Sequence, residues 1–138
     1  MGRRQAREAA MQVLYMVEIG QMPVEDAFRN LQENFPMTAG EVKFARQLVN
    51  GTLDRLAELD SIIARYSRDW CLDRMAAVDR NILRLALFEM LYIDDIPFNV
   101  TINEAVEVAK VYGGDKSGKF INGILDAVVH SDPGHRPG

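Results

Sequence analysis

The chain has 138 residues, of which 48% are hydrophobic and 26% charged, and its formal net charge is −4 at neutral pH. At this length roughly two thirds of the unfolded surface is buried on folding, so we expect a single domain over residues 1–130. The lone cysteine, Cys71, excludes an internal disulfide and a cysteine-cluster zinc site. No segment reaches the ~18 apolar residues of a membrane span, and no signal core follows the charged start, so we expect a soluble, cytoplasmic protein.

Proline, glycine and capping residues mark helix boundaries along most of the chain, and almost no strand pattern interrupts them. The first four helices are predicted over about residues 4–19, 23–34, 38–51 and 53–66. The third begins at a capping box, in which the side chains of Thr38 and Glu41 satisfy backbone N–H groups of the first turn.

A fifth helix, predicted from Asp73 or Asp79 to Tyr92, is apolar around most of its circumference, which indicates a central, largely buried element. Two C-terminal helices follow it. The chain is therefore expected to be all-α, with about seven helices joined by short connections. Residues 131–138 contain proline, glycine and histidine, and we expect a disordered tail there.

The two C-terminal helices are predicted from their own boundary signals. Thr101 and Glu104 have the spacing of a second capping box, so a helix should begin at Thr101. Gly113 should supply the left-handed residue that ends this helix, and Ser117 should open the next one.

The connection between these helices, residues 113–119, matches the phosphate-binding pattern G-x-x-x-x-G-K. Phe120 stands where magnesium would need a serine or threonine, and the pattern follows a helix instead of a strand, which argues against an NTPase. Lys116, Lys119 and the free amides of a helix N-terminus still predict an anion site, and Phe120 offers a base a surface for stacking. The alternative, with Phe120 in the core and both lysines solvated, stays open on these residues alone.

A second group of cations stands at the start of the chain. Arg3, Arg4 and Arg7 fall in the first turns of a helix, where a cation opposes the helix dipole at a cost of about a few tenths of a kcal/mol. A polyanionic partner would offset this cost, and a merely solvated basic end is the alternative. Catalysis is not indicated, because nucleophile, base and orienting group cannot be named together, and we expect neither a cofactor nor a metal site.

Five segments carry a resemblance to a known family: RRQAREAAMQVLY from residue 3, LVNG from 48, RNILRLALFE from 80, VTINEAVEVAK from 100 and KFINGILD from 119. In this order they resemble the NusB family of bacterial transcription antitermination factors, over nearly all of residues 3–130. The resemblance implies a pair of small helical bundles packed together. It also implies that the protein holds boxA RNA jointly with NusE, a ribosomal small-subunit protein, and joins elongating RNA polymerase in antitermination and ribosomal RNA synthesis.

We assign RNA contact to the cations and the ring described above: Arg3, Arg4, Arg7, Lys116, Lys119 and Phe120. The resemblance implies NusE contact at Tyr15, Ile19, Asp79, Arg84 and Tyr112. Tyr15 and Tyr112 have an alternative as core aromatics, and Asp79 has one as an N-cap. The alternative function is a NusB-like helical domain acting in ribosomal RNA modification or ribosome assembly. Some NusB-like proteins self-associate, so monomer and homodimer both stay open.

Overall fold

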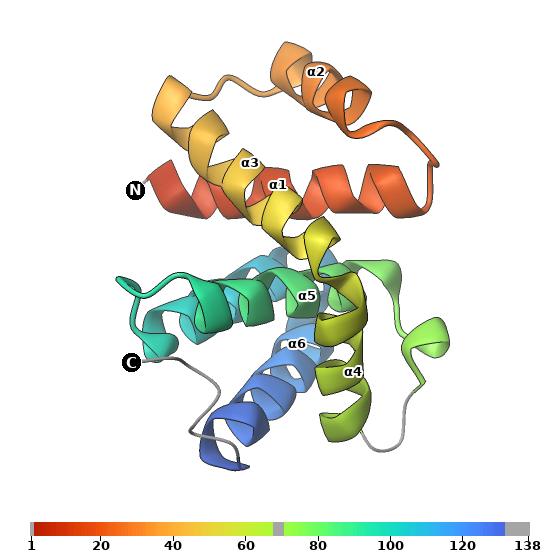
Figure 1. Cartoon of the computed structure of the whole chain (residues 1–138), viewed down its shortest axis with the longest axis vertical. Helices are drawn as coiled ribbons and strands as arrows, with labels where there is room; N and C mark the ends of the chain where they lie inside the picture. Colours follow the sequence, from red (N-terminus) through yellow and green to blue (C-terminus); the bar gives the residue numbers. More distant parts are fainter. Residues whose placement is uncertain (1, 68–70, 132–138) are drawn as a thin grey trace.

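Six α-helices in two packed bundles make up the computed structural model, which describes residues 2–67 and 71–131 (Figure 1). The first bundle holds α1 (Gly2–Glu18), α2 (Val24–Asn34) and α3 (Ala39–Asp54), and the second holds α4 (Leu56–Tyr66), α5 (Ala77–Tyr92) and α6 (Phe98–Ser131). A 3₁₀ helix, η1 (Leu72–Arg74), precedes α5. These residues contain no strand, so the predicted all-α class and the two bundles are confirmed.

The ends of the described chain qualify two of the predictions. Ser131 is the last residue of α6, so the predicted tail begins one residue too early, and residues 132–138 lie outside the described part of the chain. Among the described residues, none of the helices combines the length and the apolar character that crossing a membrane requires.

A kink in α6 explains why six helices are found where about seven were predicted. Gly114 has φ +84° and ψ −174°, a conformation that is essentially restricted to glycine, and it divides α6 into two segments. The residue with positive φ is thus Gly114, and the prediction of Gly113 was wrong by one position. Gly113 is needed for space instead, because a Cβ there would lie 2.1 Å from the Ser117 hydroxyl oxygen.

The capping box at the start of α3 is confirmed. The backbone N–H of Glu41 donates to the Thr38 hydroxyl at 3.1 Å, and the backbone N–H of Thr38 donates to the Glu41 carboxylate at 2.8 Å. Both side chains are free for this local role because neither is drawn into the core.

The capping box predicted at the start of the last helical region was wrong. α6 begins three residues earlier, at Phe98, and the backbone N–H of Thr101 donates to the carbonyl of Pro97 at 3.3 Å. The Thr101 side chain is buried and donates to Glu89 on α5, and the carboxylate of Glu104 is held by Arg4 on α1. Both side chains that the local pattern assigned to a cap are therefore hydrogen-bonded to residues of other helices.

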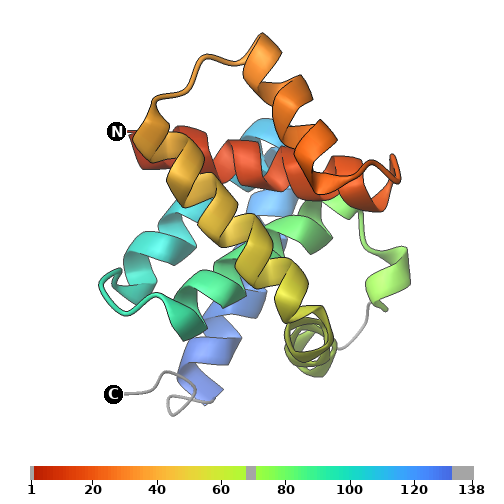
Figure 2. The same ribbon diagram turned by 45° about the horizontal axis from the view of Figure 1, so that its top comes forward.

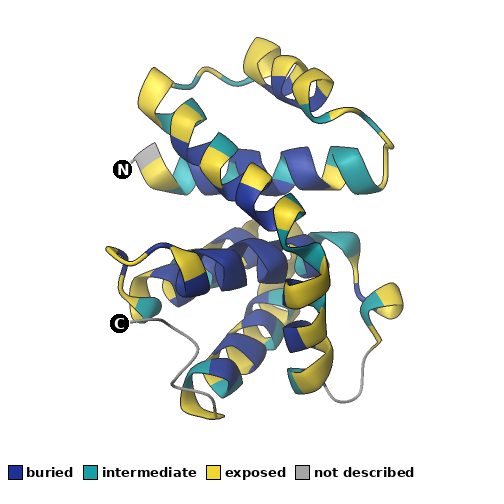
Figure 3. Cartoon of the chain, in the orientation of Figure 1, coloured by how far each residue is buried: buried dark blue, intermediate teal, exposed yellow. Residues whose placement is uncertain are grey.

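α5 is the central helix, as its apolar sequence predicted. Every residue from 80 to 91 is buried, and Figure 3 shows most of this helix in dark blue. α3 extends from the first bundle to α5 and leads into α4, which Figure 2 shows nearly end-on. Glycine is required where α3 meets α5, because a Cβ at Gly51 would lie 2.0 Å from Cζ of Phe88.

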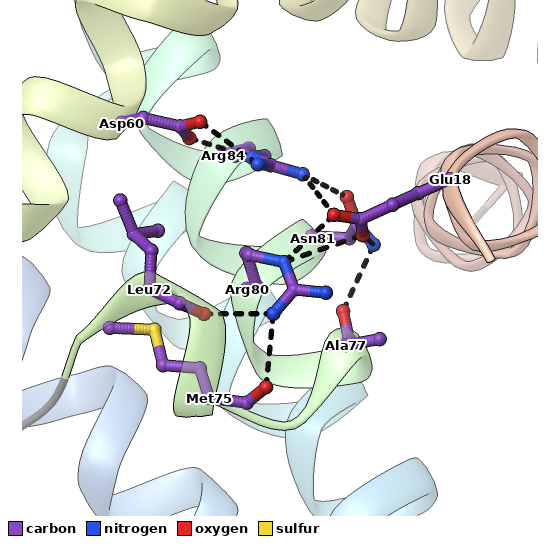
Figure 4. Close-up of polar contacts among 8 residues, drawn as sticks. All are labelled: Glu18, Asp60, Leu72, Met75, Ala77, Arg80, Asn81 and Arg84. Carbon is purple, nitrogen blue, oxygen red and sulfur yellow. Dashed lines mark hydrogen bonds and ion pairs between the residues drawn. The ribbon is translucent and has the colours of Figure 1, made fainter.

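Ion pairs at Glu18, the last residue of α1, tie the first bundle to the second (Figure 4). The Glu18 carboxylate accepts hydrogen bonds from Arg80 Nε at 3.0 Å and from Asn81 Nδ2 at 3.1 Å. Arg84 reaches Glu18 at 3.4 Å and also donates to both carboxylate oxygens of Asp60 on α4, at 2.7 and 2.9 Å. One carboxylate of α1 is thus held by three side chains of α5.

Arg80 also has hydrogen-bond partners on the 3₁₀ helix η1 and next to it. Arg80 Nη1 donates to the backbone carbonyls of Leu72 at 2.8 Å and Met75 at 3.0 Å, which fixes η1 against α5. A buried guanidinium is tolerated when its donors have partners, whereas removing one partner strands the charge. The position of α1 on α5 therefore depends on the Glu18 carboxylate.

The pH dependence of stability should report on this cluster. Partial burial raises the pKa of Glu18, but hydrogen bonds from Arg80 and Asn81 and the charges of both arginines outweigh it, so its pKa lies below the ordinary 4.5. A carboxyl with a lowered folded-state pKa contributes stability that is present above about pH 4.5 and lost as pH falls through the folded value. We expect Glu18→Gln to lower the free energy of unfolding by about 1–3 kcal/mol at pH 7, measured by urea denaturation.

The same variant should lose less stability than the wild type between pH 6 and pH 3, because its titrating group is gone. Glu33→Gln, at an exposed position of α2, is the matched control and should follow the wild-type curve. A Glu18→Gln curve parallel to the wild type would show that the pairing of Glu18 does not contribute to stability.

Candidate nucleic-acid interface

The three arginines at the start of α1 lie in three different environments. Arg3 is exposed, with its guanidinium carbon 4.4 Å from the ring centroid of Phe44. Arg4 is partly exposed and donates to both carboxylate oxygens of Glu104 on α6, from Nε at 2.5 Å and from Nη2 at 2.8 Å. Arg7 is buried. Of the three, Arg3 and part of Arg4 are accessible to a ligand.

Arg7 is held inside the protein by Glu89 of α5. Its Nε and Nη2 donate to the two carboxylate oxygens at 2.9 and 2.7 Å, and the Thr101 hydroxyl donates to the second oxygen at 2.6 Å. Opening a buried pair by removing one partner costs about 3–5 kcal/mol. The structure therefore gives Arg7 the role of joining α1 to α5 and α6, and a direct phosphate contact would have to break this pair.

Carboxylates of the chain itself offset part of the dipole cost noted in the sequence. Glu104 neutralises Arg4 and Glu89 neutralises Arg7, so these two arginines need no external anion. The argument from the helix dipole thus applies to Arg3 alone. The sequence could not separate the three arginines, because both carboxylates lie more than 80 residues away along the chain.

Lys116 and Lys119 are exposed at the α6 kink, as predicted. Phe120 is partly buried and packs against the core, so part of its ring remains at the surface. The expected core position of Phe120 is thus confirmed in part, and stacking of its ring on a base stays a prediction. A shallow cleft of about 370 Å³ places Lys119 beside Lys110, a cation that the sequence analysis missed. The stem of Lys110 reaches the second segment of α6, since a Cβ at Gly118 would lie 2.9 Å from its Cγ.

A row of charges on α6 connects Arg4 with this cleft. Glu104, Glu107 and Lys110 follow one another at spacings of three residues, which places them along one side of the helix. Glu107 and Lys110 form an exposed ion pair of 3.5 Å. We call the cations Arg3, Arg4, Lys110 and Lys119 the basic strip; Glu104 and Glu107 interrupt it.

A larger open cleft of about 810 Å³ lies where the start of α1 faces the connection between α5 and α6. Arg3 and Arg4 line one side of it. Phe35, Pro97 and Val100 supply apolar surface on the other parts of its wall. None of these apolar residues was predicted, because residues 35 and 97–100 come together only through the packing of the two bundles. The cleft has room for a planar group next to the arginines.

A second surface lies along α1 and the first segment of α6. Tyr15 is exposed on α1, Ile19 directly after the end of α1 is 52% exposed, and Tyr112 of α6 is 37% exposed. The Tyr112 hydroxyl accepts a hydrogen bond from Gln12 at 2.6 Å and donates to Glu8 at 3.3 Å, so these residues share one face. We call it the α1–α6 face. The two tyrosines are not core residues, which removes the alternative reading.

Burial, and after it the charge of Glu8, raises the pKa of Tyr112 above its ordinary value of 10.0. Its hydroxyl therefore stays protonated at neutral pH and remains a donor to Glu8. This hydrogen bond holds the tyrosine ring against α1.

Asp79 and Arg84, the other predicted partner contacts, differ in their placement. Asp79 is the third residue of α5, whose N-cap is Ala76, so the N-cap reading was wrong. Its Oδ1 is buried without a hydrogen-bond partner and would lie 3.7 Å from a Cβ at Gly113, next to the kink. Arg84 is buried in the cluster of Figure 4. Arg84 donates a hydrogen bond to Glu18 and so helps to position the residue that precedes Ile19.

Residues 4–130 match the model of the NusB family. A "Transcription antitermination protein NusB" of Pelotomaculum thermopropionicum is 51% identical, over 99% of this chain and 95% of its own. A solved structure of T. maritima NusB is 38% identical with a TM-score of 0.86, covering 98% of this chain and 93% of that one.

A chain from the crystal structure of antitermination factors NusB and NusE in complex with dsRNA also superimposes. The TM-score is 0.85 at 28% identity, over 94% of this chain and 97% of that one. The family match, the close relatives and the shared fold agree: the chain belongs to the NusB family.

Proposed function

We propose that the protein is a transcription antitermination factor that binds boxA RNA jointly with NusE and joins the RNA polymerase elongation complex in ribosomal RNA synthesis. It acts in the cytoplasm as an adaptor, by binding and without catalysis, and residues 1–130 work as one RNA-binding domain. The observation that carries the proposal is that α1 contributes to two surfaces of different chemistry. Exposed cations lie at its start, the exposed Tyr15 lies in its second half, and the exposed Ile19 follows its last residue.

The RNA surface consists of the basic strip together with Lys116 and Phe120. Exposed cations neutralise phosphates and release counterions, so binding is salt-dependent. The accessible part of the Phe120 ring stacks on a base. Arg7 does not contact RNA in this proposal; its pair with Glu89 positions α1 against α5.

NusE binds the α1–α6 face in this proposal, with Tyr15, Ile19 and Tyr112 as apolar and aromatic contacts. Interface centres are enriched in aromatic residues, and exposed apolar side chains gain most when a partner covers them. Asp79, beside the kink, adds a carboxylate whose buried oxygen has no partner within the described chain. A homodimer that buried the RNA surface would compete with RNA.

The first test is RNA binding with and without NusE. The protein alone should bind a boxA-like single strand weakly, and NusE should tighten binding by about tenfold or more through a joint surface. Fluorescence anisotropy with labelled RNA measures both affinities. Equal affinities would remove NusE from the mechanism.

The same substitution should change RNA binding when made at Arg3 and protein stability when made at Arg7. Arg3→Gln should leave stability nearly unchanged and lower the slope of log affinity against log salt by roughly 0.7, the value for one lost single-strand contact. Arg7→Gln should lower the free energy of unfolding by about 3–5 kcal/mol, because Glu89 is left buried without a cationic partner. An Arg3→Gln variant with the wild-type salt slope would show that Arg3 is only solvated.

Ile19→Asp tests the α1–α6 face. The side chain is 52% exposed, so the fold should persist, while NusE affinity should fall by about tenfold or more because a charge replaces an apolar contact. Binding of RNA by the protein alone should not change. Ala64→Asp, at an exposed position of α4, introduces the same charge and should leave NusE affinity intact. If both variants bind NusE equally well, the partner lies elsewhere.

A further inference from the structure

The carboxylate of Glu104 lies within the basic strip and occupies Arg4. Its two oxygens accept from Nε and Nη2 of Arg4 at 2.5 and 2.8 Å, and Oε1 is 3.7 Å from Nη1 of Arg7. Hydrogen bonds from Arg4 lower the pKa of Glu104, against the smaller opposing effect of burial. Glu104 is therefore a carboxylate at neutral pH, and it cancels the charge of a cation assigned to RNA.

The geometry of this pair is the one that a phosphate would adopt. A guanidinium offers a planar fork of N–H donors that matches the two oxygens of a carboxylate or of a phosphate equally well. When a phosphodiester approaches Arg4, the N–H donors that it would use are already bonded to Glu104. The phosphodiester also meets the negative charge of that carboxylate at close range.

The Arg4–Glu104 ion pair can open to admit another anion, whereas the neighbouring Arg7–Glu89 pair is buried. The side chain of Arg4 is 41% exposed and that of Glu104 22%, whereas Glu89, the partner of Arg7, is only 2% exposed. Ion pairs at the surface contribute little to folding, and the Arg7–Glu89 pair already joins α1 to the second bundle. Arg4 and Glu104 can separate without detaching α1.

We propose that Glu104 competes with RNA phosphate for Arg4 and thereby sets the affinity of the basic strip. This inference rests on the proposed RNA-binding function. Glu104 limits binding by the protein alone, and a strand bound there must displace the carboxylate from the Arg4 fork or accept its repulsion.

Glu104→Gln is the direct test, because glutamine keeps the length and one oxygen acceptor of the side chain but removes its charge. The affinity for a boxA-like single strand should rise about two- to fivefold, the range expected for releasing an ion pair near the surface. The slope of log affinity against log salt should steepen by up to roughly 0.7, one additional single-strand contact. Glu104→Ala should change both quantities in the same direction, since the acceptor is not required.

Two matched variants separate competition from a general change in charge. Glu107→Gln removes the same charge one turn further along α6, where the exposed pair with Lys110 is a single contact of 3.5 Å, and should have a smaller effect. In an Arg4→Gln background the gain from Glu104→Gln should vanish, because the two residues act through one contact. Circular dichroism and thermal unfolding establish that each variant is folded.

The outcomes distinguish this inference from the function on which it rests. A loss of RNA affinity in Glu104→Gln and Glu104→Ala would mean that Glu104 positions Arg4 for RNA, and would overturn the competition. An equal gain in Glu107→Gln, or a gain that survives without Arg4, would overturn it as well. If the wild type binds RNA with salt dependence and Glu104→Gln binds equally, the inference fails alone. If neither binds RNA at low salt, the proposed function itself fails.

Discussion

The buried pair of Arg7 with Glu89 is the contact on which the arrangement of the other parts depends. Glu89 lies on α5, which is buried along most of its length, so its charge must be compensated inside the protein. Arg7 from α1 and Thr101 from α6 supply this compensation, and three helices from both bundles meet at one carboxylate. At the other end of α1, Glu18 reverses the roles and offers a carboxylate to the arginines of α5. α1 is thus clamped at both ends by ion pairs.

This double clamp explains how one helix can serve two surfaces. Because α1 cannot rotate on α5 and α6 without breaking buried ion pairs, its start always faces Glu104 and its second half always faces the α6 kink. Gln12 and Glu8 add hydrogen bonds to Tyr112, and Glu8 also lines the larger cleft beside Arg3 and Arg4. The two proposed surfaces therefore meet along α1, which is the arrangement that joint binding of an RNA and a protein partner requires.

The sequence predicted well what depends on neighbours along the chain, and less well what depends on distant ones. The helices, the buried α5 and the capping box of Thr38 follow from local spacing. Thr101 had an equally good capping pattern, but its hydroxyl donates to Glu89 of α5 and does not cap the helix. The three N-terminal arginines were indistinguishable in the sequence, since their separation into exposed, paired and buried depends on carboxylates of α5 and α6. Exposure of Tyr15 and Tyr112 followed from the family resemblance and not from the local pattern.

Internal neutralisation of cations also affects how an acidic protein would bind RNA in the proposed function. With a formal charge of −4 the chain as a whole repels polyanions, and two of the six predicted RNA contacts, Arg4 and Arg7, are paired with carboxylates. Each phosphate contact adds to salt-dependent, sequence-independent affinity, so a surface with few unpaired cations holds back non-specific binding. In the proposed function, affinity then comes from contacts that NusE adds along the same strand. On this proposal, a basic strip that is partly neutralised by its own carboxylates makes RNA binding depend on the partner.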